Sequence, residues 1–113
     1  MKLSFTLLSI IALTSTAHAD NKDKADALFK QGKKQMSEKR YADACDSFEK
    51  SYKLDPGIGA QLNIAKCYEE WGKIGRAFVS YQAAEKMAID AKDDREAKIH
   101  ERVVALEPNV PHL

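Results

Sequence analysis

The fold is decided by residues 41–81, which read YADACDSFEKSYKLDPGIGAQLNIAKCYEEWGKIGRAFVSY. This stretch and the residues beside it hold two copies of one helical pattern, offset by thirty-three residues. The pairs that share this offset are Gly32 and Ala65, Ala44 and Ala77, Phe48 and Tyr81, and Ser51 and Ala84. A repeat of this length is typical of stacked helix-turn-helix units. The sequence therefore predicts an all-α protein.

Apolar residues recur along most of the chain at the i, i+3, i+4 and i+7 spacing of amphipathic helices. The predicted helices cover about 25–38, 41–54, 58–71, 74–90 and 93–106. Pro56 ends the second helix, because proline lacks the amide hydrogen and disfavours helical backbone in the preceding residue. Gly72 suits a left-handed cap after the third helix. Asp93 and Glu96 have the spacing of a capping box before the last helix.

The first nineteen residues have the pattern of a secretory signal peptide. Lys2 gives a positive start, residues 3–13 are mostly apolar, and Ala-His-Ala at 17–19 is a small-x-small cleavage signal. The alternative is a membrane anchor, but this apolar run rises only about 16 Å as a helix, against a bilayer core of about 30 Å. We expect cleavage after Ala19, a periplasmic or secreted protein without stable membrane insertion, and a frayed new N-terminus at 20–23.

The mature chain, residues 20–113, is expected to form one domain without net charge. The whole chain has 18 basic and 17 acidic residues, and removal of Lys2 leaves seventeen of each. This balance argues against a nucleic-acid partner and against a polybasic membrane-surface role, since both need an excess of clustered basic residues. A chain of about 94 residues buries a small core, with a stability of a few kcal/mol.

These residues resemble the tetratricopeptide-repeat family, and in particular exported repeat proteins of delta-proteobacteria and myxobacteria. The stretches that carry the resemblance are YADAC at 41–45, FE at 48–49, LDPG at 54–57, LNIAKCYE at 62–69 and ALEP at 105–108. The resemblance implies a short solenoid of two helix-turn-helix repeats, about 25–57 and 58–90, with a capping helix at about 93–106 and a tail at 107–113. The positions that it assigns to the repeat core are Gly32, Ala44, Phe48, Pro56, Ala65, Tyr68, Ala77, Tyr81 and Ala84.

Three positions depart from the family pattern. Gln31 and Gln35 stand where the pattern prefers Leu and Tyr, so we expect the first helix to be the weaker one. Lys39 stands where the repeat usually has glycine. If that turn needs left-handed backbone, the lysine costs on the order of 1 kcal/mol.

In tetratricopeptide-repeat folds the first helix of each repeat lines a concave groove that holds a partner. The residues that the resemblance places in this groove are Phe29, Lys33, Met36, Leu62, Lys66 and Glu69. Such a set suits a peptide, because apolar burial supplies affinity and lysines meet carboxylates. The alternative is that Phe29 and Leu62 only fill gaps in the core and the lysines are solvated. The resemblance thus implies a protein-protein interaction adaptor that binds a peptide or helix of an envelope protein.

Cys45 and Cys67 lie twenty-two positions apart and match neither a redox nor a zinc motif. The resemblance places them on facing surfaces of neighbouring helices, so a structural disulfide is one expectation. Two buried cysteines that never pair are the other. A bond would close a loop of about 22 residues and add roughly 3 kcal/mol of stability.

The sequence contains no arrangement of residues that indicates catalysis. Glu96 and His100 lie one helical turn apart, but no second histidine is near them except His112 in the tail. The chain also lacks a Gly-rich phosphate loop and a nucleophile beside a base. We expect no enzyme activity, no cofactor and no metal.

The last predicted helix supports an alternative function. On a helical wheel, one half of it holds Leu106, Ile99, Val103, Glu96, His100, Val104 and Ala97. This apolar arc is wider than a solvated capping helix requires. The alternative is therefore a structural subunit that completes its core as a homo-oligomer or within a larger envelope complex.

Overall fold

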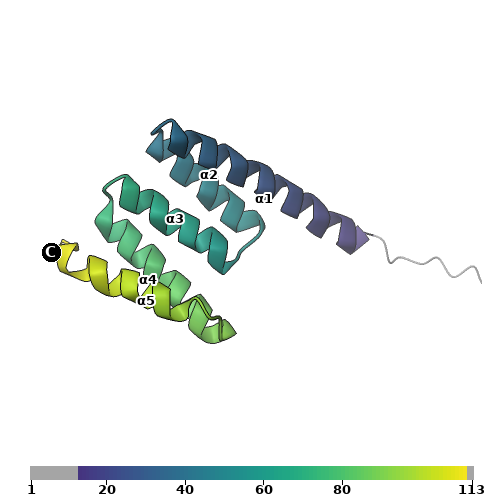
Figure 1. Ribbon diagram of the computed structural model, residues 1–113. Helices are drawn as coiled ribbons and strands as arrows, with labels where there is room; N and C mark the ends of the chain where they lie inside the picture. The colour runs from purple at the N-terminus through teal and green to yellow at the C-terminus, as the bar shows by residue number, and fades with distance from the viewer. Residues whose placement is uncertain (1–12, 112–113) are drawn as a thin grey trace, which may run out of the picture.

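The computed structural model describes residues 13–111, with side chains from residue 17 onward. Within this range the protein is all-α, without strands. The elements are α1 (Leu13–Ser37), α2 (Tyr41–Leu54), α3 (Ile58–Glu70), α4 (Ile74–Ala91), α5 (Glu96–Leu106) and a short 3-10 helix, η1 (Glu107–Asn109). Each α-helix packs against the next one along the chain, so the helices follow one another across the molecule (Figure 1).

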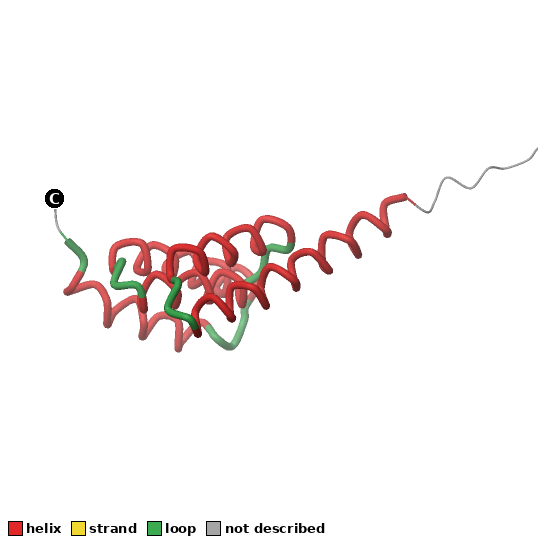
Figure 2. The backbone as a smooth tube through the Cα atoms, turned by 90° about the horizontal axis from the view of Figure 1, so that it is seen from above, coloured by secondary structure: helices red, strands yellow, loops and turns green. Residues whose placement is uncertain are grey.

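Helix α1 begins well before the predicted position. Residues 20–23, which were expected to be frayed, are helical, and exposed ion pairs of Lys24 with Asp20 and of Lys22 with Asp26, both at 3.1 Å, span successive turns there. Figure 2 shows this part of α1 extending past the other helices. Of the predicted signal peptide, residues 1–12 lie outside the described residues. No helix in 13–111 is long and apolar enough to cross a membrane.

The turns after α1 and α3 have the same backbone structure, thirty-three residues apart. Lys39 and Gly72 both have positive φ, 59° and 80°. The amide of Arg40 donates to the carbonyl of Gln35 at 2.9 Å, and the amide of Lys73 donates to the carbonyl of Tyr68 at 2.8 Å. The predicted left-handed cap at Gly72 is confirmed, and the turn at Lys39 is left-handed despite its side chain. Such a turn is the standard way to satisfy the last carbonyls of a helix.

The core lies where the small residues let helices approach. All the residues assigned to it from the sequence are buried except Pro56, which is exposed in the turn between α2 and α3. Pro56 therefore follows α2 as predicted but fills no core. A Cβ added to Gly32 would lie 2.7 Å from Cε1 of Phe48, so the phenyl ring occupies the space that any larger residue would need.

The first helix is not weakly packed at Gln35, contrary to the prediction. Gln35 is buried, and Ser47 Oγ of α2 donates to its Oε1 at 2.6 Å. One turn further along α2, Ser51 Oγ donates to the carbonyl of Ala25 at 2.7 Å. Gln31 is exposed, so it replaces no core residue. A polar pair thus fills the one buried position, Gln35, where an apolar residue was expected.

Helix α5 starts three residues later than predicted, and the capping box is not formed. The Asp93 carboxylate accepts the backbone amide and the guanidinium of Arg95, at 2.9 and 2.8 Å, in the turn before the helix. The hydrogen bond from the Arg95 side chain has the larger effect and the one from its backbone amide the smaller, and together they hold the pKa of Asp93 below its ordinary value. Of the apolar arc, Ile99, Val103 and Leu106 are buried, whereas Val104 is 52% exposed. Only part of the arc therefore contributes to the core.

Candidate functional site

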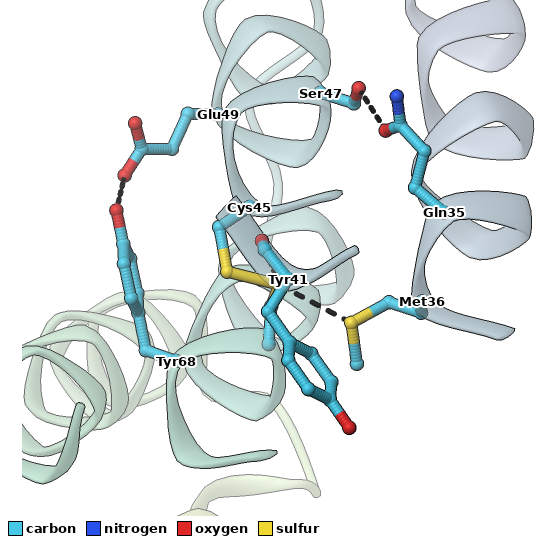
Figure 3. The surroundings of a disulfide bond; sticks show 8 residues. Gln35, Met36, Tyr41, Cys45, Ser47, Glu49 and Tyr68 are labelled. Carbon is cyan, nitrogen blue, oxygen red and sulfur yellow. Dashed lines mark hydrogen bonds between the residues drawn. A yellow bond between two sulfur atoms is a disulfide. The ribbon is translucent and has the colours of Figure 1, made fainter. Parts of the chain in front are cut away.

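A disulfide fixes the position of α3, the helix at the centre of the predicted groove. It joins Cys45 of α2 to Cys67, with the Cα atoms 5.6 Å apart, in the middle of the usual range of about 4.4 to 6.8 Å. Both residues are almost fully buried, and Figure 3 shows the side chains around the bond. The sulfur of Met36 in α1 lies 3.4 Å from Cys67 Sγ. Since a disulfide sulfur has no hydrogen to donate, this is a packing contact that brings α1 to the bond.

A cleft of about 180 Å³ lies between α1 and α3, and we call it the α1–α3 cleft. Its lining consists of Lys33, Met36, Phe48, Asn63, Lys66, Cys67 and Glu70. Three of the six predicted groove residues, Lys33, Met36 and Lys66, therefore meet here. Apolar and cationic groups stand side by side in this cleft, as the peptide hypothesis requires.

Phe29 does not line this cleft, although it was predicted to do so with the others. Its ring packs at 5.9 Å from the ring of Phe48, measured between centroids. Lys33 Nζ lies 5.2 Å from the Phe29 centroid, in a cation-π position. Phe29 is half-buried, so it both supports the core and positions Lys33.

A second cleft, of about 230 Å³, lies on the other side of α3, and we call it the α3–α5 cleft. Its lining consists of Leu62, Lys66, Tyr81, Arg95, Lys98, Ile99 and Arg102. Leu62 and Lys66 were predicted as groove residues, and the structure brings them to residues of α5. The three apolar or aromatic groups are thus surrounded by four cationic ones.

A partly buried network supports the wall of the α3–α5 cleft. Tyr81 Oη of α4 donates to the Glu69 carboxylate at 2.9 Å, and Arg102 of α5 forms an ion pair with the other oxygen of Glu69. Burial has the largest effect on the pKa of Tyr81, and together with the hydrogen bond to Glu69 it raises this pKa to about 12. Tyr81 therefore stays a hydrogen-bond donor above pH 10, where an ordinary tyrosine has lost its proton. Glu69, predicted to face a partner, ties three helices together and also lines a hollow with Lys66.

Lys66 is the residue that the clefts share. It lines the α1–α3 cleft, the α3–α5 cleft and a third hollow of about 340 Å³ above the Glu69 network. Its side chain is exposed, and it forms no ion pair with a carboxylate of residues 17–111. Lys66 is therefore placed to meet a partner in either cleft.

Helix α5 was not predicted to contribute to the groove. Arg95, Lys98 and Arg102 recur at the i, i+3 and i+7 spacing of one helical face, and Ile99 lies beside them. This stripe is visible in the sequence. It was missed because the family resemblance assigns groove positions only to the repeats, and the last helix was treated as a cap.

A larger cleft, of about 580 Å³, lies elsewhere, and its lining consists of Glu49, Tyr68, Gly75, Arg76, Val79 and Ser80. Its charged groups are already engaged. Tyr68 Oη donates to Glu49 (Figure 3), and the Arg76 guanidinium lies 5.5 Å from the Tyr68 ring centroid. Val79 is 63% exposed and is the one aliphatic group in this lining.

Comparison with protein-family models, curated proteins and solved structures gave no match. Within residues 13–111, no group of three or more His, Cys, Asp or Glu side chains is arranged to hold a metal ion.

Proposed function

We propose that this protein is an exported interaction adaptor of the tetratricopeptide-repeat type. It binds a peptide or helix of an envelope protein along the face formed by α1, α3 and α5. The repeat assignment is supported by the matching turns at Lys39 and Gly72 and by the matching small residues at Gly32 and Ala65. Export is supported by the signal-peptide pattern of residues 1–19.

The observation that carries this proposal is the pair of clefts on either side of α3, joined by the exposed Lys66. Each cleft is lined by both apolar and cationic side chains. Each is smaller than the roughly 300 Å³ at which cavities for drug-sized ligands begin, so each fits one side chain rather than a whole small molecule. A peptide that seats one side chain in each cleft uses both.

Crosslinking in cells of the native host tests the proposal. The tagged protein is crosslinked, purified and analysed by mass spectrometry, together with a variant carrying Phe29→Ala and Leu62→Ala. We expect one partner near equal stoichiometry that the variant does not recover. Thermal unfolding of the variant by circular dichroism shows whether it is folded, and Phe78→Ala, a half-buried residue of α4 outside the clefts, is the matched control. Equal recovery of the partner by the folded groove variant contradicts the proposal.

The alternative function, a structural subunit, is favoured by one observation. Val104 of α5 and Ile89 of α4 are 52% and 48% exposed, so apolar surface is left open at the last two helices. Light scattering over a range of micromolar concentrations separates the two functions. A constant monomer mass contradicts obligate self-assembly, and a mass that rises with concentration favours it.

A further inference from the structure

The α3–α5 cleft collects positive charge in a chain whose mature form is neutral. Lys66, Arg95, Lys98 and Arg102 line it, and no carboxylate does. The α1–α3 cleft differs, because Glu70 offsets one of its two lysines. Charge is therefore distributed unequally along the groove, with the excess at α5.

Two of these four cations have carboxylate partners and two do not. Arg95 is held by Asp93 at 2.8 Å, and Arg102 is held by Glu69. Lys66 and Lys98 form no ion pair with any carboxylate of residues 17–111. The cleft thus has an excess of two positive charges, on flexible side chains that can reach a ligand as compact ammonium groups.

The floor between these cations is apolar. Leu62 is half-buried, and Ile99 and Tyr81 are buried. The hydroxyl of Tyr81 is engaged with Glu69, and its ring lies under the Arg102 guanidinium, 5.8 Å from the ring centroid. An aliphatic side chain placed on this floor removes apolar surface from water. A carboxylate placed beside it meets Lys66 or Lys98 in a setting less screened than open solvent.

We propose that the α3–α5 cleft is selective for an acidic peptide segment that seats one aliphatic side chain between Leu62 and Ile99 and directs flanking carboxylates to Lys66 and Lys98. This inference rests on the proposed function and adds the chemistry of the partner and its direction in the groove. The acidic part of the partner lies at α5, because Glu70 disfavours carboxylates in the α1–α3 cleft. Free phosphates and nucleic acids lack the aliphatic group that the floor accommodates.

Selection of peptides from a phage-displayed random library tests the inference on the full chain in its oxidised state. We expect enriched sequences with an aliphatic residue flanked by Asp or Glu. Lys98→Glu weakens a labelled peptide of this kind by about tenfold or more in fluorescence anisotropy, and Lys98→Arg restores most of the affinity. Lys53→Glu makes the same charge change on an exposed residue of α2, outside the clefts, and changes the affinity by less than about twofold.

Three other outcomes overturn the inference, and they separate it from the proposed function. Peptides without acidic residues, or acidic peptides equally sensitive to Lys98→Glu and Lys53→Glu, contradict the charge selectivity. If such peptides still lose affinity with Lys33→Glu, the groove binds peptides and only the inference fails. If the library yields no enriched peptide, the inference and the peptide-binding function both fail.

Discussion

The helix pairs α1–α2 and α3–α4 have equivalent backbone positions but fill them with different side chains. In the first pair Gly32 lies against the Phe48 ring, so closely that an added Cβ has no room. In the second pair the equivalent residues are Ala65, fully buried, and Tyr81, whose hydroxyl reaches Glu69. The second pair has alanine where the first has glycine, and its aromatic residue makes a different contact. The small residue and the aromatic residue therefore differ together between the two pairs.

The same holds for the polar contacts. Gln35 of the first pair meets Ser47 within the pair, while its equivalent, Tyr68, reaches Glu49 of the preceding helix α2. Each pair therefore has an internal side-chain hydrogen bond, and the second pair is also bound to its neighbours on both sides, through Glu49 of α2 and Arg102 of α5. This comparison teaches that the thirty-three-residue offset determines the backbone, whereas the contacts between helices depend on local pairs of side chains.

The largest expected effect comes from breaking the link between the two pairs. Replacing both Cys45 and Cys67 by alanine lowers the free energy of unfolding by about 3 kcal/mol, because the bond closes a loop of 22 residues in the unfolded chain. Urea denaturation of the variant and of the reduced and oxidised wild type measures this. Alkylation followed by intact mass is the control, and two free thiols in exported, non-reduced protein contradict the bond.

The glycine of the first pair gives the next largest effect. Gly32→Ala lowers the free energy of unfolding by roughly 1 to 2 kcal/mol, since the overlap with Phe48 outweighs the better helix propensity of alanine. In a Phe48→Leu background the cost shrinks, because the ring that occupies the space is gone. Ala65→Gly, the reverse change in the second pair, costs about 1 kcal/mol through helix propensity alone. Additive effects of Gly32→Ala and Phe48→Leu in urea denaturation are the result that this explanation does not allow.

Exchanging the residues of the two turns tests their equivalence. Lys39→Gly raises the free energy of unfolding by about 1 kcal/mol, and Gly72→Lys lowers it by a similar amount, because both positions have left-handed backbone that favours glycine. Lys92, with φ 52°, should respond to glycine like Lys39. Thermal denaturation of the three variants provides the measurement. Destabilisation by Lys39→Gly is the outcome that rules out this account of the turns.

The smallest expected effect concerns the aromatic residues of the two pairs at alkaline pH. The pKa of Tyr81 is raised to about 12 in the folded protein from an ordinary value of 10.0. The unfolded chain therefore loses this proton first, so the stabilisation is complete below pH 10 and is lost as the pH rises toward 12. Phe48 has no such group. Urea denaturation between pH 8 and 11 should show a steeper loss for the wild type than for Tyr81→Phe, and parallel curves exclude the proposed shift.

Much of the fold could be predicted from periodicity and from stop residues, but contacts between distant residues could not. The bounds of α2 follow from its apolar stripe and from Pro56. The predicted start of α5 was wrong because Asp93 binds Arg95 instead of capping the helix. The Asp-x-x-Glu spacing alone does not indicate which of these contacts Asp93 makes. Gln35 is buried with a hydrogen bond to Ser47, twelve residues away. Without that partner in view, Gln35 was taken to weaken the first helix.

The candidate site was predicted in part for the same reason. Lys33, Met36 and Lys66 meet in one cleft because repeat positions determine which face of a helix they occupy. Glu69 is drawn into the Tyr81 and Arg102 network by partners on other helices. The contribution of α5 depends on how that helix packs against α4, which no local pattern encodes.

Site-specific photocrosslinking in the native host tests the central claim most directly. A photoreactive benzoylphenylalanine replaces Lys66, which the clefts share, or Lys53, an exposed residue of α2 outside them. If the face of α1, α3 and α5 binds a partner, we expect a light-dependent adduct with one envelope protein from position 66 and none from position 53. Adducts from position 53 alone, or adducts only with a second copy of this chain, contradict the claim that the face of α1, α3 and α5 binds a partner.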